Sequence, residues 1–200
     1  MIGPISKTVF LASAVCLAGP LNAGAGNVPG PVELVNFVCD GNYFSVKLPK
    51  AWPKTEMITA GRQAREYGVD LKGPKNSEGA YARISIIYYG ANHRLVKTMD
   101  KYIRLNSGPD TSLPLAGEEY GPVRDISVAG RKGKTFEVKT FVFIPPYGVK
   151  PKKVPVLEKK VILPGEKGGL YVLIYHVPSD IAQANSQIFE KTLNTFKPGP

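Results

Sequence analysis

The segment Gly130–Thr135 comes nearest to a motif with defined chemistry. Its letters, GRKGKT, end like GxxxxGK[ST], the glycine-rich loop that binds nucleotide phosphates. The first glycine of that motif would stand at position 128, which is Val128. The residues after Thr135 alternate as in a strand, whereas a phosphate-binding loop leads into a helix N-terminus. We therefore interpret the segment as a hairpin turn and expect no nucleotide site.

The two histidines, His93 and His176, stand far apart in the chain. A zinc site needs several His, Cys or carboxylate ligands at short spacing, and neither histidine has such companions. We expect no metal site and no cofactor. His176 ends an apolar segment on the face of Val172 and Ile174, which favours a hydrogen-bonded structural role, and His93 is expected in an exposed turn.

Other catalytic patterns do not occur in the sequence. No serine stands in the GxSxG setting of α/β-hydrolases, and the adjacent acids Glu118 and Glu119 lie in a Gly/Pro-bounded loop where they would point apart. Core packing accounts for the tyrosines and phenylalanines, so we expect no nucleic-acid partner. The protein is predicted not to be an enzyme. The alternative is an envelope hydrolase with a site assembled from dispersed residues, His176 among them.

Basic residues are concentrated in one part of the chain. The formal net charge is +10, and residues 131–160 hold nine basic residues against two acidic ones. This predicts an electropositive flank that binds an anionic envelope component or an acidic protein surface. A solvated strand pair that keeps the protein soluble is the other interpretation. The predicted partner-binding residues are Arg131, Lys132, Lys134, Lys150, Lys152, Lys153, Lys159 and Lys160.

The first 23 residues have the pattern of a secretory signal peptide. Lys7 precedes an uncharged apolar run over residues 8–17, and small residues stand at a cleavage position ending at Ala23. A lipoprotein with a lipidated Cys16 is the competing route, but Val15 disfavours it because that position normally holds a small residue. The run is too short for a permanent anchor, so we expect an exported mature chain, periplasmic or extracellular, with no transmembrane segment.

The remaining chain is expected to divide into a flexible Gly/Pro leader over residues 24–31 and a single domain over residues 32–200. Cys39 is then the one cysteine left, so no intrachain disulfide can form, and we interpret it as a small buried hydrophobic residue in a strand rather than a reactive thiol.

Hydrophobic periodicity predicts an α+β domain. Residues 44–48, 66–72, 82–88, 125–128, 136–139 and 157–163 alternate with period two, as in strands with one wet face. Residues 170–177 are apolar on both faces, which is typical of a central strand. Helical spacing at Val96, Met99 and Ile103 predicts one helix, and Ser179 is expected to cap a second helix that ends before Pro198. Its predicted buried stripe is Ile181, Ala184, Ile188, Phe189, Leu193 and Phe196. The predicted architecture is a largely antiparallel central sheet covered by helices.

Three segments form a combined pattern: residues 44–49 followed by Trp52, the hairpin at 128–131, and residues 170–175 followed by Pro178 and the last helix. Together they resemble the PsbP-like fold, named for the extrinsic subunit of photosystem II. The resemblance implies a helix–sheet–helix sandwich that serves as an accessory or docking module without catalytic residues. Trp52 is expected to act as a lid on the core.

Together these observations predict an exported, non-enzymatic docking domain of the cell envelope. Besides the hydrolase, a second alternative is a carrier of a small apolar ligand held between the sheet and a helix.

Overall fold

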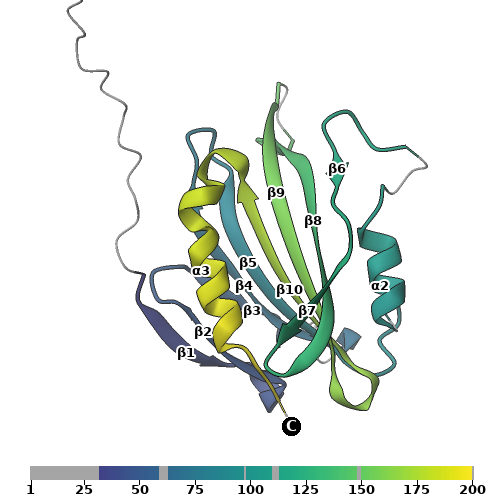
Figure 1. Cartoon of the computed structure of the whole chain (residues 1–200). Coiled ribbons are helices and arrows are strands. Elements are labelled where there is room, and N and C mark those ends of the chain that lie inside the picture. Colours follow the sequence, from purple (N-terminus) through teal and green to yellow (C-terminus); the bar gives the residue numbers. More distant parts are fainter. Residues whose placement is uncertain (1–31, 59–62, 97, 110–112, 148–149, 200) are drawn as a thin grey trace, which may run out of the picture.

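The structure, a computed structural model, describes residues 32–58, 63–96, 98–109, 113–147 and 150–199 (Figure 1). The predicted signal peptide with its Cys16, and the leader over residues 24–31, lie outside the described residues. None of the helices in the described part of the chain has the length and apolar content that a membrane span needs.

The described chain is mostly strand. Its strands are β1 (Leu34–Val38), β2 (Phe44–Pro49), β3 (Lys54–Glu56), β4 (Glu66–Lys75), β5 (Tyr81–Tyr89), β6 (Glu119–Tyr120), β7 (Arg124–Val128), β8 (Arg131–Ile144), β9 (Lys152–Pro164), β10 (Leu170–Pro178) and β11 (Lys197–Pro198). The helices are α2 (Met99–Asn106) and α3 (Ala182–Thr195), and the short 3₁₀ turns are η1 (Asp40–Asn42), η2 (Glu166–Gly168) and η3 (Ser179–Ile181).

Eight strands form one antiparallel sheet in the order β3-β4-β5-β10-β9-β8-β6, and β7 pairs with β8. The prediction that residues 170–177 form the central strand is confirmed, because β10 lies between β5 and β9 and both of its faces are largely buried. A smaller sheet, β1-β2-β11, joins the start of the domain to its end.

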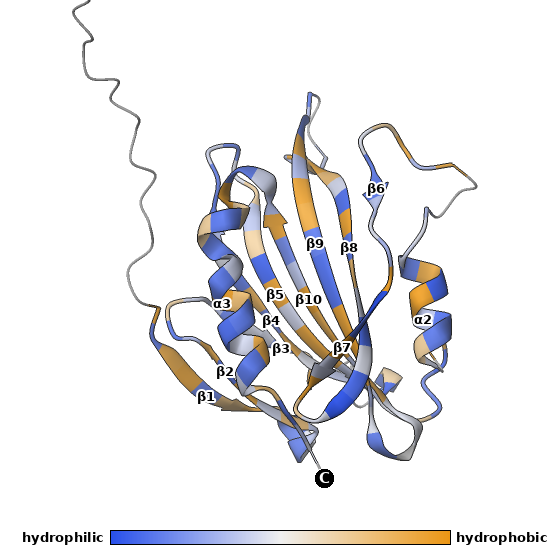
Figure 2. Cartoon of the chain, viewed as in Figure 1, coloured by the Kyte–Doolittle hydropathy of each residue, from blue (hydrophilic) through white to orange (hydrophobic). Residues whose placement is uncertain are grey.

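One face of the large sheet is covered by α3, and we call it the α3 face. Alternate side chains of β10 point to it, and Figure 2 shows the same alternation of hydrophobic and hydrophilic residues along the other strands. Phe189 and Leu193 of α3 are buried against this face, and Phe189 stacks on Tyr175 at 5.3 Å between ring centroids. The prediction for Trp52 is confirmed, because its ring is buried against Gly73. A Cβ atom on Gly73 would lie only 2.5 Å from the ring, so the close packing requires glycine at this position.

The opposite face, here called the open face, is only partly covered. Tyr102 of α2 packs on Phe136, Val138, Ile162, Leu170 and Val172, a cluster at one end of this face. A helix of eight residues is about 12 Å long, whereas the 14 residues of β8 extend over about 45 Å. The predicted sandwich with helices over both faces is therefore wrong for this face, since α2 is too short to cover it.

Both helices begin differently from the prediction. Ser179 lies in η3 and does not cap α3, which starts after Ile181 without a side-chain cap. Its neighbour Asp180 instead accepts a hydrogen bond from Asn76 Nδ2 at 3.2 Å. In α2 the cap is Thr98, whose Oγ1 accepts the N–H of Lys101 at 3.1 Å.

The buried stripe of α3 is also rotated relative to the prediction. Ala184 is exposed and Asn185 is buried in its place. The Asn185 amide nitrogen donates to the carbonyl of Ile181 at 2.9 Å, whereas its buried Oδ1 has no hydrogen-bond partner in the described structure.

Candidate functional site

The hairpin that joins β7 to β8 settles the interpretation of Gly130–Thr135. Val128 pairs with Arg131, so the turn consists of Ala129 and Gly130, with φ angles of +50° and +74°. These are the positive φ values of a tight two-residue hairpin turn. The chain continues as β8 instead of entering a helix, so the predicted hairpin is confirmed and the phosphate-loop geometry is absent from this segment.

Three of the predicted partner-binding cations lie near this turn. Arg131 pairs with Glu166 at 2.8 Å and Lys134 pairs with Asp125 at 2.7 Å, while Lys132 is exposed. Each of the two ion pairs neutralises one cation with a partly or fully exposed carboxylate, so of these three cations Lys132 alone has no ion pair in the described structure.

Three more of these cations lie at the other end of the β8–β9 hairpin. Lys150 is exposed, and Lys152 pairs with Glu78 at 2.7 Å. Lys153 donates to the carbonyl of Ala116 at 2.5 Å and stands 3.7 Å from the centre of the Phe141 ring. About ten residues of β8 separate the two ends, which corresponds to roughly 33 Å.

The last two of the predicted cations, Lys159 and Lys160, point to opposite faces of the sheet. Lys159 pairs with Glu190 of α3 at 2.7 Å, and Lys160 pairs with Glu158 on the open face at 3.0 Å. The structure thus distributes the eight cations over two ends and two faces of one long hairpin. Their binding of an anionic partner stays a prediction.

His176 belongs to a charged cluster on the open face. Its Nδ1 lies 3.0 Å from Glu158 Oε1, and since a carboxylate accepts, Nδ1 donates. Burial by itself would raise the pKa of Glu158, but the hydrogen bond from His176 and the charge of Lys160 outweigh it and lower the pKa to about 2. The predicted hydrogen-bonded role of His176 is confirmed. Among the described residues no serine hydroxyl or cysteine thiol is hydrogen-bonded to this histidine.

Two cations that sequence reasoning did not single out continue this cluster across the sheet. Lys72 of β4 lies directly opposite Arg83 of β5, and Arg83 lies directly opposite His176 of β10. Glu158 of β9 follows as the next partner of His176, so four charged or titratable side chains form one row across four strands. The alternation in the sequence places Lys72 and Arg83 on wet faces, but nothing local indicates that their strands are neighbours.

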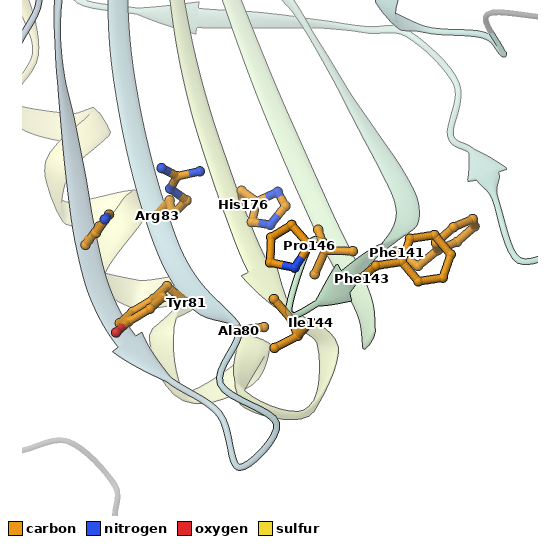
Figure 3. Close-up of a pocket in the computed structure, with 10 residues that line it drawn as sticks. Ala80, Tyr81, Arg83, Phe141, Phe143, Ile144, Pro146 and His176 are labelled. Atoms are coloured by element: carbon orange, nitrogen blue, oxygen red, sulfur yellow. The ribbon is translucent and has the colours of Figure 1, made fainter. Parts of the chain in front are cut away.

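An open cleft lies over this row (Figure 3). Its volume is about 490 Å³, and apolar surface makes up most of its lining. Lys72, Arg83 and His176 lie on one side. The end of β8 and the following segment form the other side with Ile144 and Pro146, as Figure 3 shows.

His93 and Cys39 are the other residues singled out for their chemistry. The prediction of an exposed turn for His93 is wrong: the ring is buried against Tyr89, at 4.9 Å between ring centroids, because the chain after β5 folds back over the sheet. Its Nδ1 accepts the N–H of Val96 at 3.0 Å.

The predicted burial of Cys39 is confirmed, but the residue follows β1 and precedes η1 instead of lying in a strand. Burial, together with the charges of Glu56 and Asp40, raises the pKa of its thiol to about 12. In the described ranges, no group of three or more His, Cys, Asp or Glu side chains is arranged to hold a metal ion.

No protein-family model matches the sequence, and no curated protein matches it. Among solved structures, the chain is similar to the solution structure of cyanobacterial PsbP (CyanoP) from Synechocystis sp. PCC 6803. The identity is 15% and the TM-score 0.49, over 90% of this chain and 99% of that one. CyanoP is a PsbP protein, so this structural similarity is to the same family that the three sequence segments resemble.

Two further solved structures are similar to the chain. One is a crystal structure from Bacteroides thetaiotaomicron, with 10% identity and a TM-score of 0.48 over 82% of this chain; the match spans about half, 48%, of that longer chain. The other is LpqN of Mycobacterium tuberculosis, described as involved in cell envelope biogenesis, with 15% identity and a TM-score of 0.39 over 86% of each chain. These likenesses concern the fold alone.

Proposed function

We propose that this protein is an exported, non-enzymatic docking domain that binds an anionic lipid surface of the cell envelope through the end of the β8–β9 hairpin. We call this end the hairpin tip; its described part consists of residues 143–147 and 150–153. The observation that carries the proposal is the side chain of Tyr147, which is fully exposed and close in the chain to a group of exposed lysines.

The tip projects beyond its neighbours in the sheet. β10 pairs with β9 only from Val156 onward, so residues 152–155 of β9 have β8 as their one strand partner. Figure 1 shows this end of the hairpin extending past the ends of β5 and β10. A projecting tip reaches a flat surface before the rest of the sheet does.

The side chains at the tip combine apolar and cationic character. Phe143 is 45% exposed and Tyr147 is fully exposed, close in sequence to Lys150, Lys152 and Lys153. Aromatic rings favour the headgroup level of a membrane, and each lysine near an anionic leaflet contributes about 1 kcal/mol of attraction. Only Glu78 offsets these lysines by an ion pair in the described structure. This combination fits anionic lipid better than an acidic protein surface.

The test is co-sedimentation of the mature chain, starting at Gly24, with phosphatidylglycerol vesicles and with phosphatidylcholine vesicles. We expect binding to the anionic vesicles alone, and weaker binding as the salt concentration rises. The double variant Lys150→Glu/Lys152→Glu should lower the affinity for anionic vesicles at least about tenfold. Each substitution reverses a side-chain charge and so replaces attraction to the lipid by repulsion. Tyr147→Ser should weaken binding as well.

The matched control is Lys47→Glu/Lys191→Glu, which reverses the same number of exposed lysines on β2 and α3. It should bind vesicles nearly as well as the unaltered protein. Absence of vesicle binding, or an equal loss in both double variants, would refute docking through the tip and leave an acidic protein surface as the partner to test.

Export is tested separately by the N-terminal sequence of the natural product. A start at Gly24 supports cleavage after Ala23, whereas an intact Met1 contradicts the signal peptide.

A further inference from the structure

We infer that the cleft on the open face is a binding site for an amphipathic anion, a molecule with a carboxylate or phosphate head group and an apolar body. Lys72 and Arg83 would hold the head group, and Ile144 and Pro146 would contact the body. This goes beyond docking at the hairpin tip, because it concerns a single dissolved molecule rather than a surface.

The first argument is the arrangement of the cations. Lys72 and Arg83 are direct cross-strand partners, so their Cβ atoms are only about 5 Å apart. Like charges at this spacing repel and destabilise a sheet. Neither side chain forms an ion pair within 4.0 Å in the described part of the chain, and Lys72 has only a cation–π contact with Tyr81, at 5.9 Å from the ring centre. An anion bound between them would relieve the repulsion.

The acids nearest to this pair are already engaged. Glu158, two strands from Arg83 in the same row, accepts from His176 and pairs with Lys160. Asp70, one row further along β4, accepts a hydrogen bond from the hydroxyl of Ser85, its cross-strand partner. The two cations are therefore the charges in the cleft that the protein itself leaves uncompensated.

The second argument is the rest of the lining. Across from the cations, Ile144 and Pro146 bound the cleft, and Tyr81 lies on the side of the cations, against Lys72 (Figure 3). Val142 also lines the cleft. Inorganic phosphate has no apolar part that these side chains could contact. A neutral apolar molecule would cover the charges of Lys72 and Arg83 without compensating them, which is unfavourable. The volume of about 490 Å³ lies within the usual range for small-molecule sites. The lining therefore fits an anion with an alkyl or aromatic body.

The experiment is isothermal titration calorimetry of the mature chain with decanoate and with decyl phosphate, each below its micellar concentration. Decanol and inorganic phosphate serve as probes that keep only the apolar body or only the charge. We expect one saturable site for at least one of the two amphiphiles. Both control probes should bind with an affinity at least about tenfold lower than that of this amphiphile. The preferred amphiphile identifies the head group.

Variants assign the site to the cleft. Arg83→Gln and Lys72→Gln should each lower the affinity about tenfold. Ile144→Ser should also lower the affinity, because it removes apolar contact with the body of the ligand. Lys191→Gln removes a positive charge from an exposed side chain of α3, on the other side of the sheet, and should leave the affinity unchanged. Circular dichroism and thermal unfolding confirm that each variant is folded.

Several results would overturn the inference: no saturable binding of either amphiphile, equal binding of decanol, or equal losses in Arg83→Gln and Lys191→Gln. The cleft shares Ile144 and Pro146 with the hairpin tip, but separate variants distinguish the two proposals. Arg83→Gln should not change vesicle binding, and Tyr147→Ser should not change decanoate binding, because Tyr147 does not line the cleft.

Discussion

Replacing Glu158 by glutamine should weaken the domain strongly and flatten its dependence on acid pH. The carboxylate is 23% exposed and binds both His176 and Lys160, which is itself only 12% exposed. The variant removes the negative charge but leaves the largely buried ammonium group of Lys160 beside it. Removing one partner of such a cluster lowers the free energy of unfolding by more than the whole cluster contributes to it, because the remaining buried charge is left without compensation.

The pKa of Glu158 sets the magnitude. Its ordinary value is 4.5, and the cluster lowers the pKa to about 2 in the folded protein. At about 1.4 kcal/mol per pKa unit, this corresponds to roughly 3 kcal/mol of unfolding free energy. Because the folded-state pKa is the lower one, this stability is fully present above about pH 5 and is lost as the pH falls through 4.5 toward 2.

The assay is urea unfolding followed by circular dichroism at pH 7, 5 and 3. At pH 7 we expect Glu158→Gln to lower the free energy of unfolding by about 3 kcal/mol. Between pH 5 and 3 the variant should lose less stability than the unaltered protein, since it lacks the group that titrates.

The matched control is Glu190→Gln on α3. Glu190 also pairs with a lysine of β9, but it is 48% exposed, so its removal should cost less than about 1 kcal/mol. Parallel stability curves for Glu158→Gln and the unaltered protein between pH 5 and 3 would refute the reasoning, because they would show that Glu158 does not titrate in this range.

Two further predictions concern the interior. Cys39 should react with iodoacetamide at pH 8 only when urea unfolds the protein, because burial holds the pKa of its thiol near 12. Mass spectrometry measures the alkylation, and fast alkylation of the folded protein would contradict the prediction. Gly133→Ala should lower stability by about 2 kcal/mol or more, since its Cβ would stand 2.2 Å from the carbonyl oxygen of Ile162, a backbone atom of the neighbouring strand. Gly108→Ala is the control, with no atom within 4 Å of its Cβ, and equal thermal unfolding temperatures for the two variants would count against the argument.

Much of the fold can be predicted from local patterns. Alternation along residues 66–72 and 82–88 largely separates buried from wet side chains, and the two-faced apolar run at 170–177 identifies the central strand. These predictions hold because the side-chain period of a strand depends on the backbone of that strand alone.

The errors arise where a distant segment overrides the local signal. Ser179 has the right type for a cap, but a 3₁₀ turn takes its place and Asp180 binds Asn76 from the β4–β5 connection. His93 looks like a turn residue, yet the chain folds its ring onto Tyr89. The second face of the sheet stays open because the length of α2, not its sequence pattern, limits how much it covers.

The sequence by itself determined the alternation of buried and exposed side chains along the main strands and where the basic residues are concentrated along the chain. The tertiary structure alone decided which of them meet. Lys72, Arg83, His176 and Glu158 form one row because β4, β5, β10 and β9 pair in that order and register. The physical reason is that strand pairing joins segments far apart in the chain through backbone hydrogen bonds common to nearly all residues, so the order of strands leaves little trace in the local pattern.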